Sequence, residues 1–79
     1  MVVQVHVGNL SPHTTQGEIR RLFQPYGYVT SVHLMADKAG RYSGFAFVTM
    51  DSYGAGKAIT ALHKKEVDGQ NITVYLRLV

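Results

Sequence analysis

Hydrophobic and polar residues alternate in four segments of this chain, and hydrophobic residues recur every three to four positions in two others. Alternation is typical of a β-strand with one buried face, and the longer period is typical of an amphipathic helix. The alternating segments are residues 2–8, 28–35, 43–50 and 72–77, and the helical segments follow Thr15 and Asp51. The pattern predicts the element order strand, helix, strand, strand, helix, strand.

The first helical segment carries a start signal and a stop signal. Thr15 and Glu18 have the spacing of a capping box, in which the hydroxyl and the carboxylate each bind an unpaired backbone N–H of the first turn. Pro25 and Gly27 follow the last apolar residue of the segment, and neither residue type continues a helix well. We therefore expect a helix that begins after Thr15 and closes before Gly27.

The second helical segment begins near Asp51. Gly54 and Gly56 lie in its first turns, where each glycine weakens a helix by up to about 1 kcal/mol. Further along, Asp68-Gly69 is a typical turn of a two-residue β-hairpin and leads toward the last strand.

This element order predicts a fold class. Right-handed crossover connections place both helices on the same face of a four-stranded antiparallel sheet. We therefore expect an α+β fold of the β-α-β-β-α-β, ferredoxin-like type, formed by residues 1–79 as a single domain. The alternation in the last strand predicts that Ile72, Val74 and Leu76 are buried under the helices, and the other face of the sheet stays open.

The third strand, with the sequence SGFAFVTM, is the most informative segment. Alternation sends Phe45 and Phe47 to one face and Ala46, Val48 and Met50 to the other. If the second set is buried, two neighbouring rings stand exposed on the sheet, which soluble proteins rarely show without a partner for the rings. Flat rings on an open sheet, inside a basic chain, are suited to stacking with unpaired nucleobases.

The same alternation predicts which side chains share the open face with these two rings. They are His6, His33, Phe45, Phe47, Tyr75 and Arg77. For Tyr75 the pattern leaves two interpretations open, contact with a ligand or filling of space at the edge of the sheet. His33 is either a reader of bases or an ordinary surface histidine.

Composition excludes several classes of function but does not identify one. The chain has 79 residues, a net charge of +3 and no cysteine, which excludes disulfides and thiolate chemistry. The four histidines lack metal-ligand spacing, and no phosphate-binding loop or nucleophile–base pair is visible, so we expect neither a metal or cofactor nor an enzyme. No apolar run approaches the roughly 20 residues of a membrane span.

The motifs and their spacing resemble those of the RNA recognition motif family over residues 3–79. Residues 43–50 match six of the eight positions of that family's octapeptide, Lys/Arg-Gly-Phe/Tyr-Gly/Ala-Phe-Val-x-Phe/Tyr. Its hexapeptide on the first strand corresponds here to VHVGNL, residues 5–10. The chain departs from the family at His6, which is usually Phe or Tyr, and at Ser43, which is usually a cation that pairs with phosphate. Arg41, two residues before Ser43, is a candidate substitute. The chain departs also at Met50, a core position where Met can replace the usual aromatic ring.

The resemblance implies that His6, Phe45 and Phe47 stack bases of single-stranded RNA and that nearby cations hold phosphates. The expected RNA-binding residues are His6, Asn9, His33, Arg41, Phe45, Phe47, Tyr75 and Arg77. Single-stranded DNA is a second candidate, since stacking does not depend on the 2′-OH. The alternative function is a protein–protein interaction domain of the same fold, with proteins docking on the sheet or on the helical face. We expect an intracellular monomer, in the cytoplasm or the nucleus.

Overall fold

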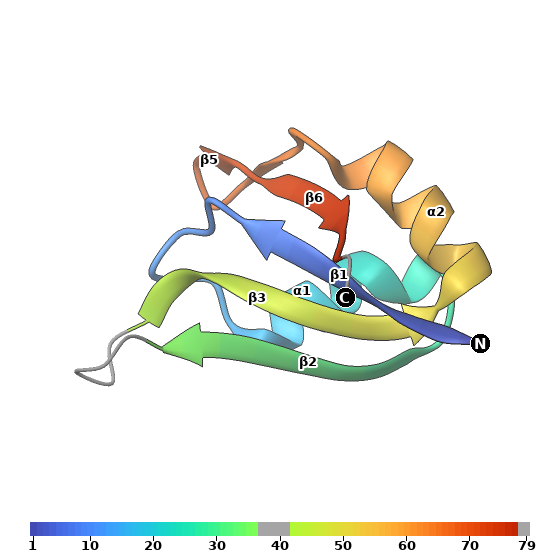
Figure 1. The fold of residues 1–79 in the computed structure, drawn as a ribbon. Coiled ribbons are helices and arrows are strands. Elements are labelled where there is room, and N and C mark those ends of the chain that lie inside the picture. Colours follow the sequence, from blue (N-terminus) through green and yellow to red (C-terminus); the bar gives the residue numbers. More distant parts are fainter. Residues whose placement is uncertain (37–41, 78–79) are drawn as a thin grey trace.

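The computed structural model describes residues 1–36 and 42–77 and has the predicted element order (Figure 1). Its main elements are β1 (Val2–Gly8), α1 (Gln16–Phe23), β2 (Val29–Ala36), β3 (Tyr42–Asp51), α2 (Ser52–Leu62) and β6 (Thr73–Leu76). A short 3-10 helix, η1 (Gln24–Tyr26), follows α1, and a small hairpin of β4 (Glu66–Val67) and β5 (Gln70–Asn71) precedes β6. The four-stranded sheet has the order β2-β3-β1-β6 with antiparallel neighbours, so the predicted fold class is confirmed.

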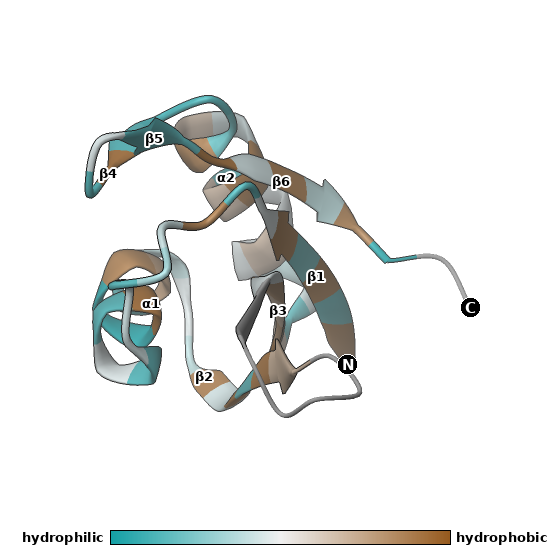
Figure 2. Ribbon diagram, turned by 90° about the vertical axis from the view of Figure 1, so that its left-hand side faces the viewer, coloured by the Kyte–Doolittle hydropathy of each residue, from teal (hydrophilic) through white to brown (hydrophobic). Residues whose placement is uncertain are grey.

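The helices and the sheet form two layers with one core between them. Both helices lie on the same side of the sheet, and no described helix covers its other side (Figures 1 and 2). The core includes Ala46, Val48 and Met50 of β3, each with no exposed surface, so the predicted facing of this strand is confirmed. Among the described residues, no helix has the length and the apolar character needed to cross a bilayer.

Side-chain caps start both helices where the sequence predicts that they begin. The Thr15 hydroxyl accepts a hydrogen bond from the backbone N–H of Glu18, as the predicted capping box requires. It also donates a 3.3 Å hydrogen bond to the Glu18 carboxylate, for which the capping box predicts a backbone N–H as partner. The Asp51 carboxylate accepts hydrogen bonds from the N–H groups of Tyr53 and Gly54, which satisfies two of the unpaired donors at the start of α2. The chain leaves α1 through the 3-10 turn that contains Pro25.

A register shift in β2 brings apolar residues that do not alternate strictly in the sequence onto the same buried face. Val29 pairs with Met50 of β3 but Ser31 pairs with Thr49, so the extra residue Thr30 forms the predicted irregularity. Because of this shift, Val29 and Val32 are both buried although they are three positions apart.

The last strand departs from the prediction at Leu76, which is 44% exposed, whereas Ile72 and Val74 are buried as predicted. Leu76 pairs with Val5 and faces the helical side with it, but it is the final residue of an edge strand. It therefore has a neighbouring strand on one side only, and the alternation alone could not show this.

Two glycines make the closest contact between α2 and the chain leaving α1. A Cβ atom built on Gly54 would lie 2.3 Å from the carbonyl oxygen of Tyr26 and 3.1 Å from the Cα of Gly27. A Cβ built on Gly56, one half-turn further along α2, meets nothing within 4 Å. Both glycines lie in the first turns of the predicted helix, but of the two only Gly54 is required by the packing of α2.

The β4–β5 hairpin has the turn that the sequence predicts. Asp68 and Gly69 both have positive φ, 51° and 84°, as a two-residue type I′ turn requires, and Val67 pairs with Gln70 across it. The Asp68 carboxylate accepts a 2.8 Å hydrogen bond from the buried Thr14 hydroxyl. The hairpin is thereby tied to the loop between β1 and α1.

Candidate nucleic-acid interface

One row of aromatic side chains crosses all four strands on the uncovered face of the sheet. The register pairs His33 of β2 with Phe47 of β3, Phe47 with His6 of β1, and His6 with Tyr75 of β6. Directly paired residues point to the same face of a sheet. The sequence therefore assigned these side chains to the correct face, and the register shows in addition that they form a continuous line. We call this line, together with Phe45, which lies two positions from Phe47 on the same face of β3, the ring row.

The rings at the centre of this row contact one another closely. The His6 ring lies 5.3 Å from the Tyr75 ring and 5.4 Å from the Phe45 ring, nearly parallel to both, and 5.5 Å from the Phe47 ring in an edge-on arrangement. Phe45 and Phe47 also meet edge-on, at 5.8 Å. Phe45 and Phe47 are only partly exposed as a result, and the cluster presents a continuous aromatic surface.

His6 occupies a special place in this cluster because one of its polar atoms has no partner. Its Nδ1 atom is buried and makes no hydrogen bond with any described residue. The ring lies against the backbone of β1, since a Cβ built on Gly8 would come within 3.0 Å of His6 Cε1. An unpaired buried polar atom costs about 1–3 kcal/mol, so histidine is a costly choice at this position.

A second row, polar in character, runs beside the ring row on the same face. Ser31 pairs with Thr49, Thr49 pairs with Gln4, and the backbone N–H of Arg77 donates a 2.9 Å hydrogen bond to the carbonyl of Gln4. Each member lies two positions along its strand from a ring of the first row. We call Ser31, Thr49, Gln4 and Arg77 the polar row.

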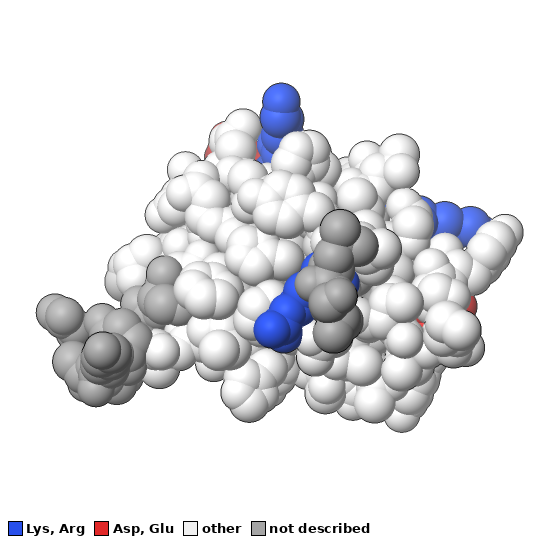
Figure 3. All heavy atoms as spheres, in the orientation of Figure 1, with Lys and Arg blue, Asp and Glu red and all other residues white. Residues whose placement is uncertain are grey.

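Arg77 links the two rows. Its guanidinium lies over the Phe47 ring, 4.3 Å from the ring centroid, and its Nη1 donates a 2.8 Å hydrogen bond to the side-chain oxygen of Gln4. The side chain thus reaches from the end of β6 across β1 to β3. On this face, basic atoms lie near the centre of an otherwise largely uncharged surface, and the visible acidic atoms lie at its margins (Figure 3).

The other predicted residues occupy less central positions. Asn9 is exposed beyond the end of β1, and its side-chain amide donates to the carbonyl of Asn71, so it holds the β4–β5 hairpin. Tyr75 is 48% exposed and contacts His6, which fits either interpretation of it. Arg41 lies outside the described residues.

His63 takes part in the structure at the edge of the sheet. Its Nδ1 accepts a 3.0 Å hydrogen bond from the backbone N–H of Val74, and its ring centroid lies 5.9 Å from that of Tyr75. This contact places a further ring beside the end of the ring row. Nothing in the sequence pattern signals it, because His63 follows the end of α2 and reaches β6 through the tertiary fold.

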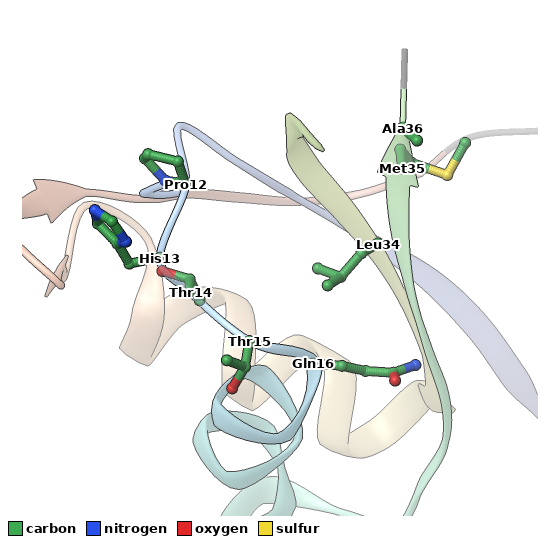
Figure 4. Close-up of a pocket in the computed structure, with 8 residues that line it drawn as sticks. All are labelled: Pro12, His13, Thr14, Thr15, Gln16, Leu34, Met35 and Ala36. Atoms are coloured by element: carbon green, nitrogen blue, oxygen red, sulfur yellow. The ribbon is translucent and has the colours of Figure 1, made fainter. Parts of the chain in front are cut away.

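A separate hollow of about 400 Å³ lies between the β1–α1 loop, the start of α1 and β2. Leu34 points into it, whereas the neighbouring Met35 points away (Figure 4). At its floor the side-chain amide of Gln16 donates to the carbonyl of Val32. The hollow contains no member of the ring row. Among the described residues, no group of three or more potential metal ligands is present anywhere.

Comparison with known proteins decides the family. A model of the RNA recognition motif family matches residues 5–73. The chain belongs to this family. Among similar proteins, the chain is 42% identical to glycine-rich RNA-binding protein 1 of Mycosarcoma maydis over 76 residues, 94% of this chain and 43% of that protein. It is 38% identical to a cytoplasmic and nuclear polyadenylate-binding protein of Eremothecium gossypii over 89% of this chain and 12% of that protein. The chain therefore spans less than half of either relative.

Solved structures with the same motif are also similar. The crystal structure of RNA-binding protein PG1 has a TM-score of 0.91 and 35% identity, covering 98% of this chain and 95% of that one. The structure of an SXL-lethal protein/RNA complex has a TM-score of 0.85 and 30% identity over 95% of this chain and 47% of that one.

Within this RNA recognition motif, sequence reasoning found the ring row and Arg77 but did not recognise the rest of the polar row. The signal was present, because Gln4, Thr49 and Ser31 each lie two positions from a predicted ring and so share its face. Only the register shows that these side chains line up with Arg77.

The unpaired Nδ1 of His6 leads to a first expected result. Replacing His6 with Phe, the residue type that the family resemblance suggests, should raise the free energy of unfolding by about 1 kcal/mol, because it removes a buried polar atom without a partner. Urea denaturation measures the change. The matched control is His33→Phe in the same row, where the side chain is exposed and no gain is expected. A loss of stability in His6→Phe would show that the site requires an imidazole.

Proposed function

We propose that this RNA recognition motif binds single-stranded RNA on the uncovered face of its sheet. Bases stack on the rings of His6, Phe45 and Phe47, and neighbouring cations hold the phosphates. The observation that carries the proposal is the continuous ring row on a face that no described helix covers. The named activity of the relatives, RNA binding, supports the same conclusion.

The proposed contacts would together give a moderate affinity. A base stacked on an aromatic ring contributes about 1–3 kcal/mol. Two or three such stacks, together with a few phosphate contacts, reach roughly −8 kcal/mol, which corresponds to a dissociation constant near 1 μM. Single-stranded DNA is the second candidate ligand, because the stacking surface of a base does not depend on the 2′-OH.

The proposed site comprises the rings and the charged or polar groups around them. Its members are His6, Asn9, His33, Arg41, Phe45, Phe47, Tyr75 and Arg77. We infer that residues 1–79 act as one domain and as a monomer, without a cofactor and without catalytic activity. We propose an intracellular location, in line with the name of the polyadenylate-binding relative, which places that protein in the cytoplasm and the nucleus.

Binding to a fluorescently labelled pool of random single-stranded RNA, followed by anisotropy, tests the proposal. If about three phosphates are neutralised, log Kd should change with log salt concentration with a slope near 2 in magnitude, since single strands give about 0.7 per phosphate. An unlabelled DNA pool of the same length serves as competitor and separates the two nucleic acids. No binding at low salt, or binding that does not respond to salt, would contradict the proposal and favour a protein-docking domain.

A further inference from the structure

The exposed face of Phe47 is occupied in the free protein. The guanidinium of Arg77 lies 4.3 Å from the ring centroid, on the surface that a base would need for stacking. Backbone pairing fixes the start of this side chain, because the Arg77 N–H donates to the carbonyl of Gln4. The Gln4 side chain fixes its end through the 2.8 Å hydrogen bond to Nη1.

We propose that Gln4 and Arg77 form a latch over Phe47, which RNA must open before a base can stack there. This inference rests on the proposed function and adds a residue, Gln4, that sets the affinity without itself being a stacking group. A binding surface that is open only part of the time binds more weakly in proportion to the open fraction. Gln4 lowers that fraction, since it stabilises the closed position of Arg77.

The surroundings of Arg77 leave room for the latch to open. A hollow of about 320 Å³ lies on one side of the side chain, bounded by Ser31, His33 and Phe47 among others. A second hollow of about 370 Å³ lies on the other side, bounded by Val2, Val3 and Leu76. Gln4, Thr49 and Arg77 line both hollows. Moved toward the second hollow, the guanidinium would uncover Phe47, which already borders the first hollow.

RNA can replace both contacts that hold Arg77 in the closed position. Gln4 accepts from the guanidinium through a neutral amide oxygen, whereas a phosphate group carries a negative charge and can accept two parallel hydrogen bonds from a guanidinium. The cation–π contact with Phe47 is of the modest kind found at exposed sites. An RNA strand offers replacements for both, because its base stacks on the ring and its phosphate pairs with the released guanidinium.

The test is a pair of truncations in one cross-strand pair, Gln4→Ala and Thr49→Ala. Both remove a polar side chain from the same face, but the hydrogen bond that Arg77 donates is accepted by the side chain of Gln4. We expect Gln4→Ala to bind the random RNA pool about two- to fivefold more tightly than the unmodified protein, because the closed position of Arg77 loses the modest net stabilisation of one exposed hydrogen bond. Thr49→Ala should show no gain.

A second readout follows the latch without RNA. In NMR spectra of the free protein, the Hδ protons of Arg77 should be shifted upfield by the Phe47 ring, and Gln4→Ala should reduce that shift while Thr49→Ala preserves it. If the unmodified protein binds RNA and Gln4→Ala binds it with equal or lower affinity, the latch is overturned but the proposed function is not. Weaker binding would indicate that Gln4 contacts RNA directly. Failure of the unmodified protein to bind RNA at all would overturn the proposed function together with the latch.

Discussion

Replacing both Phe45 and Phe47 with alanine is expected to weaken RNA binding by about a hundredfold or more. Two stacked bases contribute about 1–3 kcal/mol each, and the double variant loses both surfaces at the centre of the ring row. Fluorescence anisotropy with the labelled random RNA pool measures the loss. Binding within threefold of the unmodified protein would show that the ring row is not the RNA platform.

The control for this variant must separate lost contacts from lost stability. The two rings are partly buried against each other and against His6, so their removal should lower the free energy of unfolding by about 1–3 kcal/mol. The control is Val48→Ala. Val48 lies on the same strand but faces the core, and its side chain has no exposed surface. This substitution should cost a comparable amount, about 2 kcal/mol, and leave RNA binding nearly unchanged. Equal loss of binding in both variants would point to unfolding as the common cause.

Gly54→Ala is expected to destabilise the protein by about 3 kcal/mol, although alanine is the better helix former. The added Cβ would lie 2.3 Å from the carbonyl oxygen of Tyr26, and this neighbour is backbone rather than a movable side chain. Either α2 or the segment around Gly27 must then shift, and overpacking of this kind costs about 1–3 kcal/mol or more. Urea denaturation of the purified variant measures the effect.

Gly56→Ala is the matched control in the same helix. A Cβ at this exposed position meets nothing within 4 Å, so the substitution should stabilise the protein by up to about 1 kcal/mol. The two variants are therefore expected to shift the free energy of unfolding in opposite directions. Stabilisation by both would mean that α2 and the η1 turn do not approach as closely as the structure shows.

The fold and the ring row were predictable from sequence because both depend on local periodicity. Alternation in β3 assigns Phe45 and Phe47 to one face and Val48 to the other, whatever the rest of the chain does. Capping by Thr15 and Asp51 depends on residues within one helical turn. Such local patterns can be interpreted without knowledge of tertiary contacts.

The features that sequence reasoning missed all depend on contacts between distant segments. Gly54 and Gly56 look alike in the sequence, but only one faces the backbone of Tyr26. The buried Nδ1 of His6 and the position of Arg77 over Phe47 follow from the pairing of three strands. A single sequence carries no signal of register between strands, and these contacts could be stated only after the sheet was known.

The central claim is that the uncovered face of the sheet binds RNA, and an NMR titration tests it most directly. Isotopically labelled protein is titrated at low salt with a pool of short random single-stranded RNA. The account predicts chemical-shift changes concentrated at His6, Phe45, Phe47, Tyr75 and Arg77, with little change on α1 and α2. No changes on the sheet, or changes confined to the two helices, would contradict it and would make this chain a protein-docking member of the RNA recognition motif family.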